Sequence, residues 1–167
     1  MKWYFIKLDN SIQKAQFDCG IPQLNDYLKK YALQNDKKGV AKVIVAIPAQ
    51  GDRVVAGYYT ISMSLIERES IPDKEAKRLP RYPLPAMLVG KLAVDKSRQG
   101  QKLGEELLIN ALDKALNLSE EVGIFAVRVD ALDERAKSFY LKYGFQPFQD
   151  QPFSLFITIK TIKQLYM

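Results

Sequence analysis

Two glycines, Gly100 and Gly104, lie in a predicted turn that connects a strand to a helix. The strand is the apolar run Met87–Val94, and the helix is predicted from Leu103 to Leu116, where leucine and alanine recur with a period near four. Glycines in such a turn let main-chain N–H groups face an anion beside the positive end of the helix. The pattern therefore predicts a pyrophosphate site, and a tight connection without a ligand is the alternative.

The sequence excludes several other kinds of chemistry. It contains no histidine, so the usual general base and a common zinc ligand are absent. Cys19 is the single cysteine, which excludes an internal disulfide and a multi-cysteine metal site. We interpret its thiol as a buried filler rather than a nucleophile. No metal centre is expected.

Length and composition suit one compact domain over residues 1–167. The N-terminal residues alternate aromatic and charged side chains, as in a first strand and unlike a cleaved signal. No run of about eighteen apolar residues predicts a membrane span. We therefore expect a cytoplasmic protein with no membrane contact. The net charge of +6 favours an anionic partner, although a surplus of this size also serves solubility.

Elements predicted on either side of the glycine turn alternate between strands and helices. They are a strand at Met1–Leu8, an amphipathic helix within Phe17–Asn35, a β-hairpin of Val40–Ile47 and Val54–Ile66, a strand at Ile124–Val129, a helix between Asp133 and Gly144, and two short strands within Pro147–Ile159. Pro22 suits the start of the first helix, and Asp133 can cap the later one. The C-terminal segment is polar. This order of elements predicts an α/β domain.

Residues 67–85 form a proline-rich loop of mixed charge. Its basic residues recur at helical spacing, so a helical turn would project them together. They are Lys74, Lys77, Arg78 and Arg81, which we call the basic strip. Pro80 and Pro83 make the last part of the segment non-helical. A solvated charged loop is one interpretation, and a phosphate-binding strip beside an active site is the other.

The glycine turn belongs to a longer motif, Leu-Ala-Val-Asp, four residues, then Gln-Gly-x-x-Leu-Gly. It resembles the acetyl-coenzyme A binding motif of the GNAT superfamily of N-acetyltransferases, in which a glycine stands where this chain has Lys102. The resemblance implies cofactor contacts from Leu92, Ala93, Val94, Gln99, Gly100, Gln101, Lys102, Leu103 and Gly104. The Lys102 ammonium would assist the pyrophosphate if the backbone angles allow it, but cofactor affinity would suffer if the position needs a positive φ.

A second motif, Ala136-x-x-Phe139-Tyr140 followed by Gly144-Phe145, is similar to the closing motif of the same family. Helical spacing alone makes most of these aromatic side chains core residues. The resemblance implies that Tyr140 points towards the cofactor sulfur and acts as the general acid that protonates the coenzyme A thiolate. It also implies a single GNAT domain with a mixed, mostly antiparallel, splayed sheet and helices on both faces.

Short sequence motifs outside these two are similar to motifs of the GNAT toxins of bacterial toxin–antitoxin systems, the TacT and AtaT type. These motifs begin at Phe17 (Phe-Asp-Cys-Gly), Leu28 (Leu-x-x-Tyr-Ala-x-Gln-Asn), Gly57 (Gly-Tyr-Tyr-Thr-Ile-Ser) and Gly90 (Gly-Lys-Leu-Ala-Val-Asp). The resemblance implies that the acceptor is the free α-amino group of aminoacyl-tRNA, whose acetylation blocks translation. It further implies a ribbon-helix-helix antitoxin as partner, and a homodimer is compatible with it.

The chemistry of that acceptor suits a chain without histidine. An α-amino group with a pKa at or below about 8 is partly neutral and nucleophilic at physiological pH without a strong protein base. A main-chain N–H near Leu92–Val94 could stabilise the oxyanion formed by its attack on the thioester. We identify no dedicated base in the sequence.

Two other functions remain open at this point. One is acetylation of a small amine or a protein amino group, in which case the basic strip serves only solubility. The other is a non-catalytic binding module, in which Lys102 has disabled the cofactor turn. A measurement of acetyl-CoA binding distinguishes the non-catalytic module from the two acetyltransferase functions.

Overall fold

The computed structural model describes residues 2–166, so Met1 and Met167, at the ends of the predicted first strand and C-terminal segment, lie outside it. In the described part, seven strands form a sheet in the order β1-β2-β3-β4-β5-β7-β6. They are β1 (Trp3–Lys7), β2 (Lys42–Pro48), β3 (Gly57–Ile66), β4 (Leu84–Val94), β5 (Ala126–Asp130), β6 (Gln146–Pro147) and β7 (Ser154–Thr158). β4 and β5 run parallel, whereas the β1–β2, β2–β3, β5–β7 and β6–β7 pairs are antiparallel. The predicted hairpin and the mixed, mostly antiparallel sheet are confirmed.

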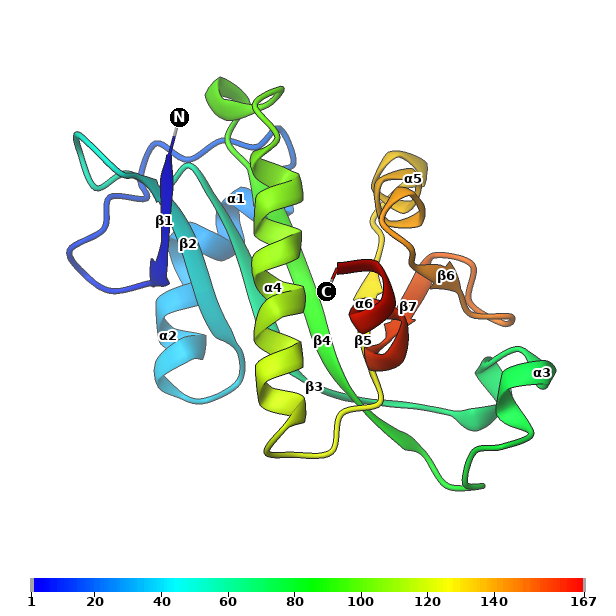
Figure 1. Ribbon diagram of the computed structural model, residues 1–167. Helices are drawn as coiled ribbons and strands as arrows, with labels where there is room; N and C mark the ends of the chain where they lie inside the picture. Colours follow the sequence, from blue (N-terminus) through cyan, green and yellow to red (C-terminus); the bar gives the residue numbers. More distant parts are fainter. Residues whose placement is uncertain (1, 167) are drawn as a thin grey trace. The chain divides into compact units, whose positions relative to one another are not determined.

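Helical segments connect these strands (Figure 1). They are α1 (Pro22–Asp26), the π-helix η1 (Tyr27–Tyr31), α2 (Ala32–Lys37), the 3₁₀ turn η2 (Arg68–Ser70), α3 (Asp73–Ala76), the 3₁₀ turn η3 (Lys96–Arg98), α4 (Leu103–Ser119), α5 (Glu134–Lys142) and α6 (Ile159–Tyr166). Pro22 stands at the start of α1, as predicted. The single helix predicted within Phe17–Asn35 is interrupted by the π-helical turn, and α6 forms where only a polar segment was described.

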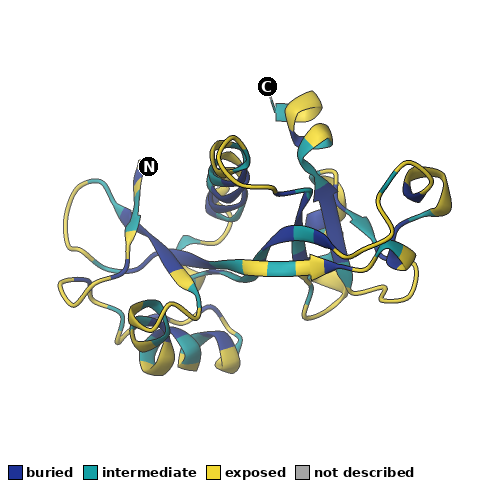
Figure 2. Ribbon diagram, turned by 90° about the horizontal axis from the view of Figure 1, so that it is seen from below, coloured by how far each residue is buried: buried dark blue, intermediate teal, exposed yellow. Residues whose placement is uncertain are grey.

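The chain divides into two compact units. The first unit contains the residues through Ser62 together with Gly90–Ala111, and the second contains Met63–Val89 with the residues from Leu112 onward. In the first unit, α1 and α2 lie on one face of the strands and the start of α4 lies on the other (Figure 2). Helices on both faces of the sheet were predicted from the sequence, and the first unit has this arrangement.

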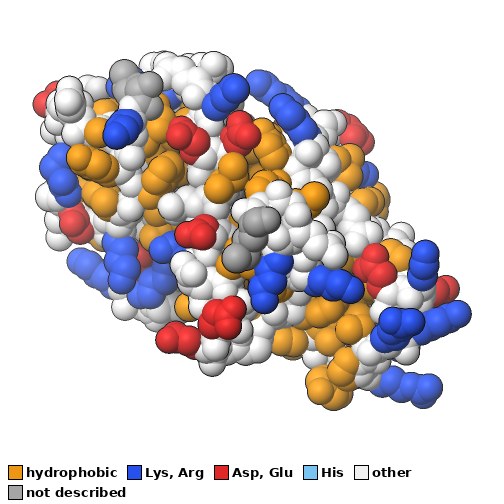
Figure 3. Space-filling model, in the orientation of Figure 1, with side chains coloured by type: hydrophobic (Ala, Val, Ile, Leu, Met, Phe, Trp, Pro, Cys, Tyr) orange, Lys and Arg blue, Asp and Glu red, His pale blue; other side chains and the backbone are white. Residues whose placement is uncertain are grey.

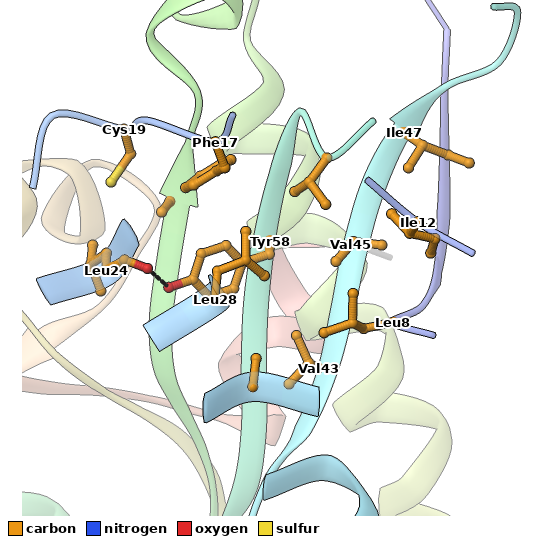
Figure 4. Packing of buried hydrophobic residues seen from close by; sticks show 13 residues of the cluster. Leu8, Ile12, Phe17, Cys19, Leu24, Leu28, Val43, Val45, Ile47 and Tyr58 are labelled. Carbon is orange, nitrogen blue, oxygen red and sulfur yellow. Dashed lines mark hydrogen bonds between the residues drawn. The ribbon is translucent and has the colours of Figure 1, made fainter. Parts of the chain in front are cut away.

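The core of the first unit lies between its strands and the α1–α2 segment (Figure 4). It joins side chains from four parts of the chain: Leu8 and Ile12 after β1, Phe17 and Cys19 in the following turn, Leu24, Leu28 and Ala32 from the helices, and Val43, Val45, Ile47, Val55, Tyr58 and Ala93 on or beside the strands. Alternate residues of β2 enter this cluster because side chains alternate across a strand. Burial of this apolar surface holds the N-terminal segment against the sheet.

Three consecutive residues at the start of β3 hold both helical layers of the first unit. The Tyr58 hydroxyl donates to the Leu24 carbonyl at 2.7 Å, and the Tyr59 hydroxyl donates to Asn110 Oδ1 at 2.6 Å. A Cβ on Gly57 would lie 2.9 Å from Leu107 Cδ1. The absence of a side chain at Gly57 therefore lets α4 pack closely against the strand that follows the hairpin turn.

The second unit has a separate core, which includes Ile66, Ile71, Ala76, Leu84, Ala86, Ala126, Phe148 and Phe156. The rings of Phe148 and Phe156 stack with centroids 4.8 Å apart. Because Ile71 and Ala76 are buried here, the loop before β4 is anchored at its base even though its charged residues are exposed. None of the helices in the described part of the chain combines the length and the apolar character needed to span a bilayer.

Candidate active site

The turn between β4 and α4 contains two residues in the left-handed backbone region. Gly100 has a φ of +82° and Lys102 a φ of +64°. The carbonyl of Lys102 accepts the N–H of Glu106 at 3.1 Å, which makes this the first hydrogen bond of α4. Within residues 2–166, the N–H groups of Leu103 and Gly104 donate to no main-chain carbonyl outside α4. Such groups at the positive end of a helix suit an anion.

The space beside this turn is open. A Cβ built on Gly100 would meet no heavy atom within 4 Å. Gln101 and Lys102 are exposed, whereas Leu103 is buried and fixes the start of α4 in the core. Exposed main-chain N–H groups next to the buried Leu103 suit a diphosphate, whose oxygens accept several N–H groups at once. The predicted turn residues thus come together in the first unit.

Lys102 is the departure from the GNAT pattern, and its backbone explains why the family has glycine there. Among the described residues it is the one non-glycine residue with a positive φ. An L-residue in this region clashes with its own carbonyl, at a cost of roughly 1–2 kcal/mol, whereas glycine does not. The position therefore has the positive φ that the sequence raised as a concern. Its effect on cofactor affinity stays a prediction.

A turn from the N-terminal segment braces the cofactor turn. Asp95 Oδ2 accepts the N–H of Asp18 at 3.0 Å, and Asp95 Oδ1 accepts the N–H of Ser97 at 2.9 Å. The N–H of Lys96 donates to the Asp18 carbonyl at 2.8 Å. Burial tends to raise the pKa of Asp95, but these hydrogen bonds outweigh it and the net pKa is lowered. A carboxylate therefore ties η3 to a turn 77 residues earlier in the chain.

Gln99 adds a second tie between the same two segments. Its Nε2 donates to the Val94 carbonyl at 3.0 Å and to the Cys19 carbonyl at 3.3 Å. A Cβ on Gly20 would lie 3.2 Å from Lys96 Cε, so a side chain there would crowd the same contact. This brace gives a physical role to the Phe-Asp-Cys-Gly motif, which the sequence identified only by resemblance. Cys19 itself is buried, and burial raises the pKa of its thiol.

The end of β4 leads into this turn. Ala93 is buried in the core of the first unit, and Leu92 and Val94 are half-buried. The N–H of the following Asp95 donates to the Ala56 carbonyl at 2.8 Å, which fixes the end of the strand. Leu92, Ala93 and Val94 are therefore held rigidly just before the turn.

Tyr140 lies in the second unit, on α5, and is 6% exposed. Its ring packs between Phe139 and Phe145, with centroid distances of 5.3 and 5.4 Å. Burial raises the pKa of its hydroxyl, with the Asp130 charge as a smaller cause. The hydroxyl has no hydrogen-bond partner among residues 2–166. Among the same residues, Arg128 Nε is the one side-chain polar atom that is both fully buried and without a hydrogen bond, so the Tyr140 hydroxyl is not fully buried. It therefore reaches solvent as a protonated donor.

Both ends of α5 are fixed, which holds Tyr140 in place. The Asp133 side chain accepts the N–H of Ala136 at 2.8 Å, which confirms the predicted N-cap. At the other end Gly144 has a φ of +98°, and a Cβ there would lie 2.7 Å from Leu165 Cδ1 on α6. The Tyr166 hydroxyl donates to the Tyr143 carbonyl at 2.7 Å. The unpredicted C-terminal helix α6 thus supports the helix that carries Tyr140.

The basic strip also lies in the second unit. Lys74 is on α3, which ends at Ala76 with Lys77 at its C-cap. Arg78 and Arg81 follow the helix, so the four residues do not share one helical face as the spacing alone suggested. All four are exposed, and Figure 3 shows Lys and Arg side chains gathered over α3. The surface formed by the basic strip is positively charged, although α3 is too short to place all four residues on one helical face.

A sequence profile of the acetyltransferase (GNAT) domain matches residues 41–147, which include β2 to β6 and the cofactor turn. The match covers more than half of the chain. The chain therefore belongs to the GNAT family of acetyltransferases.

Relatives within the family are more specific. The chain is 29% identical over 159 residues to a tRNA-acetylating toxin of Mycobacterium tuberculosis (strain ATCC 25618 / H37Rv), covering 95% of this chain and 93% of the relative. AtaT complexed with acetyl-methionyl-tRNAfMet has a TM-score of 0.93 at 30% identity, covering 99% and 100% of the two chains. A tyrosine-to-phenylalanine variant of AtaT bound to the C-terminus of the antitoxin AtaR and acetyl-CoA has a TM-score of 0.86 at 28% identity, covering 99% and 98%. The predicted similarity to GNAT toxins is confirmed.

Proposed function

We propose that this protein is an acetyl-CoA-dependent N-acetyltransferase toxin that acetylates the free α-amino group of aminoacyl-tRNA, blocks translation and is neutralised by a cognate antitoxin. The observation that carries the proposal is the braced β4–α4 turn within a GNAT fold that matches tRNA-acetylating toxins along nearly its whole length. Acetyl-CoA would supply the acetyl group as an activated thioester. Residues 1–167 would act as one GNAT domain.

In this proposal the cofactor is bound mainly by main-chain groups of the first unit. The N–H groups around Gly100 and Gly104 would bind the pyrophosphate. Gln99, Gln101, Lys102 and Leu103 would complete the turn, and Leu92, Ala93 and Val94 would line the thioester end. A main-chain N–H of that segment would hold the acetyl oxygen as negative charge develops on it.

Tyr140 is the proposed general acid. Its hydroxyl is held protonated by burial, has no acceptor within the described residues and is fixed by a helix anchored at both ends. A fixed proton donor would deliver its proton to the departing thiolate. The acceptor amine needs no strong base, because a sizeable fraction of an α-amino group is neutral near pH 7.5.

The partners follow from the same proposal. The basic strip would bind tRNA phosphates by charge, which suits its exposed lysine and arginine side chains. By analogy with AtaT and AtaR, the antitoxin would bind the toxin directly, and we propose a ribbon-helix-helix protein for this role. A homodimer and a cytoplasmic site of action complete the proposal, since aminoacyl-tRNA is used in the cytoplasm.

The test is a direct assay of acetyl transfer from acetyl-CoA to purified aminoacyl-tRNA, read by mass spectrometry of the released amino acid. Tyr140→Phe should bind acetyl-CoA nearly as well as the wild type but turn over about 10²- to 10⁴-fold more slowly, as expected for loss of a general acid. Tyr143→Phe is the matched control, because it removes the same hydroxyl three residues later, at the C-cap of the same helix.

Three results would contradict parts of this assignment. A folded Tyr140→Phe protein with wild-type turnover would remove the general acid. A wild type that binds acetyl-CoA and acetylates only small amines or protein amino groups would leave the enzyme class intact and overturn the tRNA substrate. A wild type that does not bind acetyl-CoA would favour a non-catalytic module.

A further inference from the structure

One lysine of the first unit is held in a partly buried place without an anion. Lys91, on β4, is half-buried, and burial lowers the pKa of its ammonium group. Within residues 2–166 it makes no hydrogen bond or ion pair, whereas Lys30, Lys42 and Lys96 each pair with an aspartate. Desolvating a charge without a partner costs free energy. Such an uncompensated charge in a structured place marks a candidate ligand contact.

The ammonium is nevertheless held in position. Lys91 Nζ lies 4.1 Å from the centroid of the Tyr27 ring, a cation–π contact. Tyr27 is itself fixed, because its ring stacks on Tyr58 at 6.4 Å and its hydroxyl accepts from Asn35 Nδ2 at 3.3 Å. The lysine therefore has little freedom left to lose when an anion binds, which favours binding.

The helix that carries Tyr27 is distorted at this residue. Tyr27 opens the π-helical turn η1, and Tyr31 closes it. π-Helical turns are rare, and within α-helices they occur frequently at functional sites. The contact between Tyr27 and Lys91 therefore joins two features that each cost free energy. One is the irregular helical turn that begins at Tyr27, and the other is the half-buried Lys91 ammonium without an anionic partner among residues 2–166.

The place of Lys91 along β4 indicates which anion it would bind. It comes directly before Leu92–Val94, the segment proposed to line the thioester, and a strand rises about 3.3 Å per residue. Lys91 and Ala93 point to the same face of the strand, the face covered by α1 and η1. An acceptor that carries a phosphate close to its amine would therefore meet this ammonium. Aminoacyl-tRNA carries one on the terminal nucleotide, whose ribose bears the aminoacyl ester.

We propose that Lys91, held over the Tyr27 ring, is a binding subsite for the 5′-phosphate of the terminal nucleotide of the aminoacyl acceptor. This inference rests on the proposed function. The pyrophosphate of acetyl-CoA is the other source of phosphate near this strand, and the Gly100–Gly104 turn already accounts for it. The subsite gives the enzyme a way to prefer a nucleotide-linked amine over a small amine or a protein amino terminus.

Two acceptors that differ by one phosphate test the subsite. Methionyl-adenosine 5′-phosphate and methionyl-adenosine present the same amine and the same ester, so the ratio of their kcat/KM values isolates the phosphate. We expect the wild type to prefer the phosphorylated compound by roughly ten- to hundredfold, the range of a hydrogen bond between charged groups. Lys91→Met should abolish this preference while leaving the rate on methionyl-adenosine unchanged. Lys91→Arg should retain most of the preference.

Lys14→Met is the matched control, because Lys14 belongs to the same unit and its ammonium pKa is likewise lowered by burial. It should keep the wild-type ratio. Acetyl-CoA affinity, measured by calorimetry, should not change in Lys91→Met, and a large loss would assign the contact to the cofactor and overturn the inference. Loss of rate on both acceptors would overturn it too, in favour of a proton-transfer role. If the wild type acetylates neither compound nor aminoacyl-tRNA, the proposed function itself is wrong and the subsite is rejected with it.

Discussion

Replacing Lys102 by glycine separates the two roles of this position, backbone and charge. Its φ of +64° costs an L-residue roughly 1–2 kcal/mol, and glycine removes that cost. Against this, glycine makes the unfolded chain more flexible, which destabilises the folded state by about 0.4–1 kcal/mol. The net expectation is that Lys102→Gly raises the free energy of unfolding by about 0.5–1 kcal/mol. For a chain of this length, that corresponds to a Tm increase of about 1–4 °C.

The matched control is Lys102→Ala, which removes the same ammonium but keeps a Cβ at the positive φ. Thermal unfolding of the three proteins, followed by circular dichroism at one pH and one salt concentration, should show a raised Tm only for Lys102→Gly. If Lys102→Ala raises the Tm as much as Lys102→Gly does, the gain comes from removing a charge, and the argument from backbone strain is wrong.

Calorimetric titration with acetyl-CoA completes this experiment. An exposed ammonium beside a pyrophosphate contributes about 0.2–1 kcal/mol, so Lys102→Ala should weaken binding by up to about fivefold. Lys102→Gly should weaken it equally or less, since its backbone fits the turn without strain. Tighter binding by both variants would mean that the lysine side chain obstructs the cofactor, and the proposed contact would be rejected.

Other measurements address the remaining parts of the site. Gly104→Glu should abolish acetyl-CoA binding in calorimetry, because a carboxylate would stand where the pyrophosphate must approach the backbone, and unchanged affinity would exclude the turn as the cofactor site. Replacing the basic strip by alanine should raise KM for aminoacyl-tRNA and flatten its salt dependence without changing acetyl-CoA affinity, and an unaltered salt slope would make the strip a solvated loop. The pH profile of kcat/KM should rise through the pKa of the acceptor amine and then level off, because burial raises the pKa of Tyr140 far above neutrality. An inflection that stays at one pH when the acceptor amine is changed would instead reveal a protein base.

Much of the fold follows from local patterns in the sequence. The apolar run before Gly100 and the four-residue period after it are confirmed as β4 and α4, and Asp133 caps α5 as its residue type suggested. These features depend on neighbouring residues alone. The C-terminal helix α6 was not predicted, although Ile159, Ile162 and Leu165 recur at helical spacing among its polar residues. Its contacts with the end of α5 at Gly144 and Tyr143 are tertiary, so the sequence pattern alone does not indicate them.

The candidate site was predictable to a smaller extent. The turn residues and Tyr140 were identified because family motifs mark them. The brace between Asp18 and Asp95 joins residues 77 positions apart, so no local pattern indicates it. A role for Lys91 was not predicted for a related reason. In the sequence it is a single charged residue inside the apolar run Met87–Val94. Only the structure places its ammonium over Tyr27 and shows that no aspartate among residues 2–166 pairs with it.

The absence of histidine from the sequence determines how the proposed chemistry can be shared between enzyme and substrate. With an acceptor amine that is already partly neutral, the protein need only bind negative charge and donate one proton. In the proposal, negative charge on the pyrophosphate, the acetyl oxygen and the nucleic acid would be bound by main-chain N–H groups, Lys91 and the basic strip. In the proposed mechanism the proton comes from Tyr140, whose hydroxyl has a pKa raised by burial. These donors carry their protons or charge before the substrate binds, and none of them depends on a titration near neutral pH. We therefore expect the enzyme's selectivity to depend more on where the acceptor carries phosphate than on the basicity of any side chain.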